Sequence, residues 1–126
     1  ARLGLGYRYS ALKNLVDLVG PGVAKDLFFT ARRIDAAEAR AVGLVTRVAE
    51  PAALDALLAE YATAMADNAP LTVMAGKAII GEILKPSPEL DHARCADLIR
   101  GCFDSADYVE GRTAFMQKRK PVFTGH

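Results

Sequence analysis

The chain of 126 residues has no tryptophan, only two cysteines and no strong excess of charge of either sign. A net charge of +1 argues against a protein that follows a nucleic-acid backbone, since such proteins usually carry a large basic excess. No apolar run approaches the roughly 20 residues that a membrane-spanning helix needs, and no charged-then-apolar leader opens the chain. We therefore expect no nucleic-acid or membrane partner and a cytoplasmic location. The 52% of hydrophobic and 25% of charged residues are typical of a folded globular chain.

The two cysteines, Cys95 and Cys102, lie seven residues apart on one predicted helix. Two helical turns separate them, which is too far for a disulfide. His92 is the only other residue close by that zinc prefers as a ligand, so we expect no metal site. The thiols are predicted to be buried as small hydrophobic groups.

The first 50 residues combine short helical patterns with turn signals. Apolar residues recur at helical spacing over residues 9–19, and a Gly-Pro-Gly run then ends that helix and begins another, which reaches about residue 30. An Asp-x-x-Glu capping box predicts a short helix over residues 35–43, with a glycine at its C-terminal cap. Residues 44–49 alternate and are rich in β-branched side chains, which predicts a β-strand.

The rest of the chain is predicted to be helical. The expected helices cover residues 51–68, 71–84 and 89–103, and a last one begins near Ser105 or Asp107 as its cap. The helix over 71–84 has almost no polar face, and a helix that is apolar nearly all round is buried on several sides. In a chain this small, we expect another subunit or a missing part of the protein to cover it.

The C-terminal run E-G-R-T-A-F-M-Q-K-R-K-P, residues 110–121, resembles the closing signature of the enoyl-CoA hydratase/isomerase (crotonase) family. Three earlier stretches are also similar to family segments, in the same order. They are L-G-L at residues 3–5 with the helix that ends in V-G, I-D-A-A-E-A leading to G-L-V over residues 34–45, and N-A-P at residues 68–70.

The resemblance implies the C-terminal part of a crotonase-like α/β spiral fold, mostly α in this chain, with one or two short β-strands. Residues 1–50 would form the end of the spiral αβ core, and residues 51–126 a C-terminal helical assembly region. The implied partners are an acyl-CoA thioester, the missing N-terminal half of the same protein, and further copies of it in a trimer or a dimer of trimers.

The function implied by the resemblance is that of an acyl-CoA-binding enzyme, which adds water across the double bond of an enoyl-CoA thioester or shifts that bond. Coenzyme A would be part of the substrate, and no separate cofactor is expected. The family alignment places Ala1 just after the second catalytic glutamate of the hydratases, so we expect no catalytic residue in this chain and no activity of the chain alone. Other thioester-enolate chemistry, such as decarboxylation or dehalogenation, and a helical assembly module without activity remain alternatives.

Phe115 and Lys118 are three residues apart, which puts an apolar ring and an ammonium group on neighbouring positions of one helical face. The resemblance places this pair near the acyl chain and the coenzyme A phosphates. Arg119 and Lys120 extend the basic cluster and could meet the same phosphates. The alternative is a core phenylalanine followed by lysines and arginine in solvent near a helix C-terminus.

Tyr7 is the third candidate binding residue, because the resemblance places its hydroxyl, like those of Tyr9 and Ser10, at the rim of the acyl pocket. The alternative is a partly exposed helix N-terminus without a binding role. The family commonly continues L-G-L with a proline and a glycine-rich turn, whereas this chain has bulky residues from Tyr7 to Tyr9. We expect these side chains to narrow or reshape the pocket. Glu38 is not a catalytic candidate, since its place in the capping box accounts for it.

Overall fold

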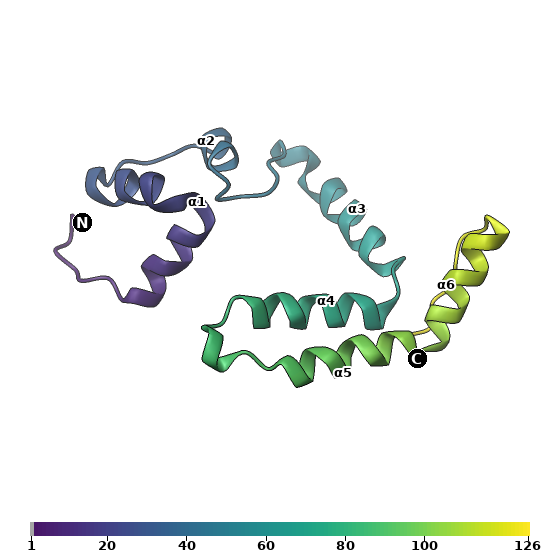
Figure 1. Cartoon of the computed structure of the whole chain (residues 1–126). Coiled ribbons are helices and arrows are strands. Elements are labelled where there is room, and N and C mark those ends of the chain that lie inside the picture. The colour runs from purple at the N-terminus through teal and green to yellow at the C-terminus, as the bar shows by residue number, and fades with distance from the viewer. Residues whose placement is uncertain (1) are drawn as a thin grey trace. The chain divides into compact units, whose positions relative to one another are not determined.

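The computed structural model describes residues 2–126, which form two compact units, one up to Leu54 and one from Asp55 to His126. Figure 1 shows the elements along the chain. The helices are α1 (Tyr9–Thr30), α2 (Ala36–Ala41), α3 (Leu54–Ala66), α4 (Pro70–Ile83), α5 (His92–Phe103) and α6 (Ala106–Gln117), with 3₁₀ turns at Pro51–Ala53 and Ser87–Glu89.

The prediction of a β-strand over residues 44–49, and with it of one or two short strands in the chain, is wrong for residues 2–126, which are helical with irregular connections. The alternation of residues 44–49 suits a strand, but a strand persists only when a neighbouring strand pairs with its N–H and C=O groups. The described chain offers no such neighbour. The segment therefore stays irregular after α2.

The long helix α1 consists of two helices that meet at a kink, as the Gly-Pro-Gly run predicts. Gly20 has φ 77° and ψ 162°, far from helical values, and Pro21 begins the second helix. At its C-terminus, Ala31 adopts the left-handed conformation with φ 48°, and its N–H donates to the Leu27 carbonyl at 3.1 Å.

The capping of α2 is confirmed at both ends. The Asp35 carboxylate accepts a hydrogen bond from the Glu38 N–H at 2.8 Å, and Gly43 is left-handed with φ 81°. The Glu38 carboxylate faces Arg32, whose Nη1 donates to it at 2.9 Å. This pairing holds the pKa of Glu38 below its ordinary value. The Glu38 side chain therefore forms a local ion pair with Arg32, while its N–H makes the capping bond to Asp35.

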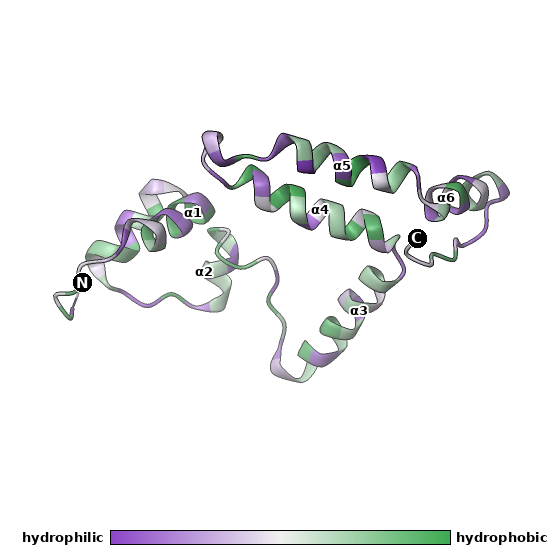
Figure 2. Cartoon of the chain, turned by 90° about the horizontal axis from the view of Figure 1, so that it is seen from below, coloured by the Kyte–Doolittle hydropathy of each residue, from purple (hydrophilic) through white to green (hydrophobic). Residues whose placement is uncertain are grey.

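In the second unit α4 and α5 run side by side, and both views show this pairing (Figures 1 and 2). The two helices are joined by Glu82, which is only 2% exposed. Its carboxylate accepts from Lys85 Nζ at 2.7 Å and from the Asp91 N–H at 3.1 Å, and Arg94 lies 3.4 Å away. The hydrogen bond from Lys85 is the main reason why the pKa of Glu82 is lowered. Glu82, a buried carboxylate on a mainly apolar helix, thus stabilises the α4–α5 connection.

The apolar side chains of α4 are largely open to solvent. Figure 2 shows how much of this helix is hydrophobic, and Met74, Ile80 and Ile83 are each more than half exposed. Among the described residues, the buried apolar side chains are all alanines, and no large side chain is completely buried. A run of exposed apolar groups of this kind marks an interaction surface.

Candidate functional site

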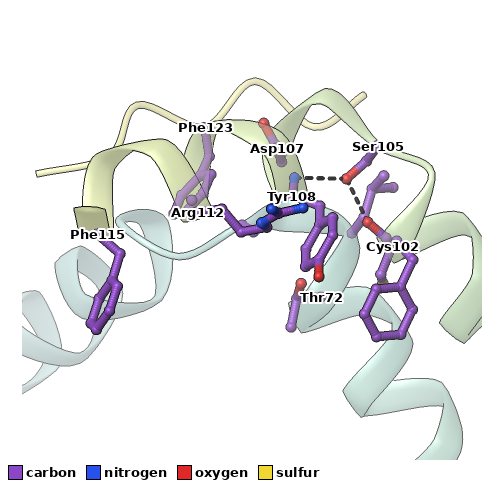
Figure 3. Close-up of a pocket in the computed structure, with 12 residues that line it drawn as sticks. Thr72, Cys102, Ser105, Asp107, Tyr108, Arg112, Phe115 and Phe123 are labelled. Carbon is purple, nitrogen blue, oxygen red and sulfur yellow. Dashed lines mark hydrogen bonds between the residues drawn. The ribbon is translucent and has the colours of Figure 1, made fainter. Parts of the chain in front are cut away.

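A pocket of about 500 Å³, the C-terminal pocket, lies within the second unit (Figure 3). Its lining includes Leu71 and Thr72 of α4, Cys102 and Phe103 of α5, Tyr108, Arg112 and Phe115 of α6, and Phe123 of the tail that follows α6. Since most of these groups are apolar, the pocket suits an apolar or aromatic part of a ligand.

One wall of the C-terminal pocket is an aromatic cluster that carries a positive charge. The rings of Phe103 and Tyr108 meet edge to face, with centroids 5.1 Å apart and an angle of 80° between their planes. The Arg112 guanidinium lies over the Tyr108 ring, 5.5 Å from its centroid. The wall therefore offers both a flat surface and a planar cation to a ligand.

The position of this wall depends on the start of α6. Ser105 caps the helix, because its Oγ accepts from the Tyr108 N–H at 3.1 Å, and the same hydroxyl donates to the Cys102 carbonyl at 2.7 Å. Figure 3 shows both bonds at one end of the pocket. Of the two caps that the sequence allowed, Ser105 is the one in place, and it links the end of α5 to the beginning of α6.

Phe115, at the other end of the pocket in Figure 3, is 82% exposed. It is therefore not a core residue within the described chain. Its ring borders the pocket on the last turn of α6, just before Lys118 ends the helix. Phe115 and Lys118 are both exposed, but only Phe115 belongs to α6. Lys118 follows the helix in a left-handed conformation, so the two residues do not continue one helical face as their spacing predicts.

The three consecutive basic residues after α6 have different surroundings. Arg119 donates to both oxygens of Glu110, with Nη1–Oε1 2.6 Å and Nη2–Oε2 2.7 Å, and Lys120 Nζ lies 2.8 Å from Asp67 Oδ2. The exposed Lys118 ammonium has no hydrogen-bond or ion-pair partner among residues 2–126. Of the three, Lys118 alone has a charge that no carboxylate of the described chain neutralises.

Lys118 also has an unusual backbone. Its φ of 54° and ψ of 38° are left-handed, and its N–H donates to the carbonyls of Ala114 and Phe115 to end α6. Glycine is the usual residue at such a position, because a Cβ makes the left-handed conformation unfavourable. A lysine here stores local strain of a kind that is often found at functional sites.

Tyr7 belongs to the first unit, whereas Phe115 and Lys118 belong to the second. Its ring meets Phe28 edge to face with centroids 5.0 Å apart, and it is 53% exposed. With Leu3 and Leu5 it lines a cavity of about 180 Å³. Tyr7 is therefore held by packing and still presents part of its ring to solvent.

Three other features of the described residues are relevant to function: metal-ligating groups, the cysteines and long apolar helices. Residues 2–126 contain no group of three or more His, Cys, Asp and Glu side chains that could hold a metal ion. Cys95 and Cys102 are free and half-buried rather than buried as predicted, because α5 is covered on only part of its surface. None of the helices in the described part of the chain has the length and hydrophobicity to cross a membrane.

Sequence reasoning missed the residues that complete the C-terminal pocket, above all Tyr108, Arg112 and Phe123. It also missed that the tail is fixed to α6 by Asp107 and Glu110. Glu110 and Arg119 both stand in the signature run, but a motif does not tell which of its charges pair with one another. The left-handed turn at Lys118 brings Glu110 and Arg119 together, and no glycine in the sequence predicts that turn.

The chain matches the family model described as enoyl-CoA hydratase/isomerase over residues 1–126. It is 35% identical to the methylmalonyl-CoA decarboxylase of Escherichia coli, covering 98% of this chain and 48% of that protein. It is 36% identical to the short-chain-enoyl-CoA hydratase of Clostridium acetobutylicum, covering 94% of this chain and 45% of that one.

The fold is also similar to a crystal structure of an enoyl-CoA hydratase/carnithine racemase from Magnetospirillum magneticum. The TM-score is 0.84 at 37% identity, over 99% of this chain and 46% of the other. The chain thus spans about half the length of the relatives that it matches.

Proposed function

Because the chain belongs to the enoyl-CoA hydratase/isomerase family, we propose that it is the coenzyme A-binding C-terminal part of an enzyme that adds water across, or shifts, the double bond of an enoyl-CoA thioester. The relatives are enzymes by name and are about twice as long as this chain. In this proposal the acyl-CoA is the substrate, and the groups that perform the chemistry lie in the part of the enzyme outside this chain.

The observation that carries the proposal is the free charge of Lys118 beside Phe115. Arg119 and Lys120 are paired with carboxylates, so Lys118 is the basic residue of this cluster that is left to meet a phosphate. An ammonium group attracts phosphate oxygens as a point charge. The adjoining C-terminal pocket, lined mainly by apolar groups, receives an apolar or aromatic part of the same ligand.

Tyr7 is proposed to lie at the rim of the acyl site. Its half-exposed phenol would donate a hydrogen bond to a polar acyl group, or its ring would narrow the space for the acyl chain. Packing against Phe28 supports either role, because it fixes the ring without burying it.

The exposed apolar face of α4 supports a second part of the proposal. We propose that residues 1–50 belong to the end of the spiral core and that residues 51–126 form the assembly region of a trimer or a dimer of trimers. Met74, Ile80 and Ile83 would be covered there by a neighbouring subunit or by the N-terminal half of the enzyme.

Decarboxylation of an acyl-CoA is the second candidate reaction. It is favoured by the 35% identity with a methylmalonyl-CoA decarboxylase. Both reactions pass through charge on the thioester carbonyl, so the same coenzyme A site serves either one.

The test uses the protein that carries this chain together with any N-terminal portion encoded with it. Crotonyl-CoA is offered, and loss of the enoyl-thioester absorbance is followed; methylmalonyl-CoA is offered separately, and carbon dioxide release is followed. Hydration or isomerisation supports the proposal, and decarboxylation alone supports the second candidate. If neither thioester binds or reacts, and coenzyme A does not bind, the proposal is wrong.

A further inference from the structure

The chain reverses direction immediately after α6 and returns along it. Lys118 makes the turn, and residues 119–126 then run back beside the helix to its N-terminal end (Figure 1). Two carboxylates of α6 hold this tail. Asp107 and Glu110 are three residues apart, so both lie on one face of the helix, the face along which the tail runs.

Glu110 fixes the beginning of the tail with three hydrogen bonds. Its Oε1 accepts from Arg119 Nη1 at 2.6 Å and from the Val122 N–H at 2.9 Å, and its Oε2 accepts from Arg119 Nη2 at 2.7 Å. The carboxylate is half-buried, and these bonds, first of all those from Arg119, lower the pKa of Glu110 to about 2. It is therefore ionised whenever the protein is folded near neutral pH.

Asp107 fixes the far end of the tail. It is 3% exposed and accepts from the Thr124 N–H at 2.7 Å and from the Gly125 N–H at 2.9 Å. Between the two attachments, Phe123 reaches the lining of the C-terminal pocket. Asp107 thus holds the end of the tail, and Glu110 holds the residues that follow Lys118.

We propose that Glu110 is a positioning residue for Lys118. By holding Arg119 and Val122, it keeps the left-handed turn in place and so fixes the direction in which the Lys118 ammonium leaves the end of α6. This inference rests on the proposed function, because it assumes that Lys118 meets the phosphates of coenzyme A.

A purely structural role for Glu110 makes a different prediction. If Glu110 only stabilised the tail, its loss would lower the melting temperature and leave the contribution of Lys118 to binding intact. If Glu110 acts through Lys118, its loss matters for coenzyme A only while Lys118 is present. A double-mutant cycle separates the two, because it measures the coupling between the two side chains.

The experiment measures the Kd of coenzyme A by calorimetry, in the protein with any N-terminal portion encoded with this chain. We expect Lys118→Ala to raise the Kd about fivefold and Glu110→Ala to raise it roughly threefold. The double variant should match Lys118→Ala alone. Glu110→Gln keeps an oxygen that can accept from Arg119 and Val122, so it should fold like the parent and show a smaller rise than Glu110→Ala.

Glu38→Ala is the matched control, because it removes another carboxylate paired with an arginine, in the first unit. It should leave the Kd of coenzyme A unchanged. Pantetheine, which lacks the nucleotide and its phosphates, should bind all variants alike.

Two results would overturn the inference alone. One is a double variant whose Kd rises by the product of the single effects, and the other is a Glu110→Ala variant that binds coenzyme A like the parent while Lys118→Ala does not. If Lys118→Ala itself leaves the Kd unchanged, the phosphate role of Lys118 in the proposed function is wrong, and the inference falls with it.

Discussion

Replacing Lys118 by glycine should make the protein more stable and a weaker binder of coenzyme A. The left-handed backbone of Lys118, with φ 54°, costs a residue that has a Cβ about 1–2 kcal/mol, and glycine avoids this cost. Glycine loses more conformational freedom on folding, which offsets about 0.5–1 kcal/mol. Loss of the ammonium from a helix C-terminus removes a further ~0.3 kcal/mol. The free energy of unfolding should therefore rise by about 0.5 kcal/mol, or roughly 2 °C in melting temperature.

The assay combines thermal unfolding with calorimetric titration of coenzyme A. Ala31→Gly is the stability control, because Ala31 has the same left-handed backbone with φ 48° and no charge. It should raise the melting temperature slightly more than Lys118→Gly does. Lys118→Ala keeps the backbone strain, so its melting temperature should stay close to that of the parent while its affinity falls as in the glycine variant.

Two outcomes would refute this reasoning. A lower melting temperature for Lys118→Gly would mean that the lysine side chain stabilises the turn. The left-handed backbone at Lys118 would then not be strained. An unchanged affinity for coenzyme A in a stabilised variant would mean that the strain is real but serves no phosphate contact. In the second case Lys118 is a lysine in solvent near a helix end.

Three further predictions concern acid stability, assembly and activity. In the folded chain the pKa of Glu110 is about 2 instead of 4.5, and the pKa values of Asp107 and Glu82 are also lowered. The stability that these carboxylates contribute should therefore be fully present above about pH 4.5 and be lost as the pH falls toward 2. Glu110→Gln should make that loss shallower in acid unfolding curves, and a pH profile identical to that of the parent would contradict the pairing. Because α4 exposes Met74, Ile80 and Ile83, light scattering should show a trimer, a hexamer or a complex with the N-terminal half, whereas a clean monomer at micromolar concentration would count against an interface there. The purified 126-residue chain should not hydrate crotonyl-CoA if, as we propose, the acid/base groups lie outside it, because loss of such groups costs roughly 10²–10⁴-fold each. Turnover above background would show that the chain contains catalytic groups after all.

Local signals were sufficient to predict the helices. The kink at Gly20, the Asp35 cap, the left-handed Gly43 and the Ser105 cap depend on residues within one turn of one another, and each lies where the sequence predicts it. The prediction of a strand over residues 44–49 is wrong, because a strand needs a neighbouring strand to pair with, and residues 2–126 do not provide one. A pattern can show that a segment suits a strand, but it cannot supply the neighbour.

The site was only partly predictable for a similar reason. The resemblance suggests a ligand for Phe115 and Lys118, but helical spacing does not place Lys118, because α6 ends at Gln117 and Lys118 is left-handed. That Arg119 and Lys120 are paired, while Lys118 is free, depends on Glu110, Asp67 and the reversal of the tail. The partners lie 9 residues away in one pair and 53 in the other, a long-range pairing that no local pattern specifies.

The most direct test of the account is the affinity for coenzyme A of the parent protein and of Lys118→Ala, measured at low and at high salt. A contact between Lys118 and the phosphates predicts a severalfold difference in affinity between the two proteins at low ionic strength. The difference should be smaller at high salt, because ions screen the charge, and pantetheine should bind both proteins equally throughout. Equal affinities of the two proteins for coenzyme A at low ionic strength would contradict it.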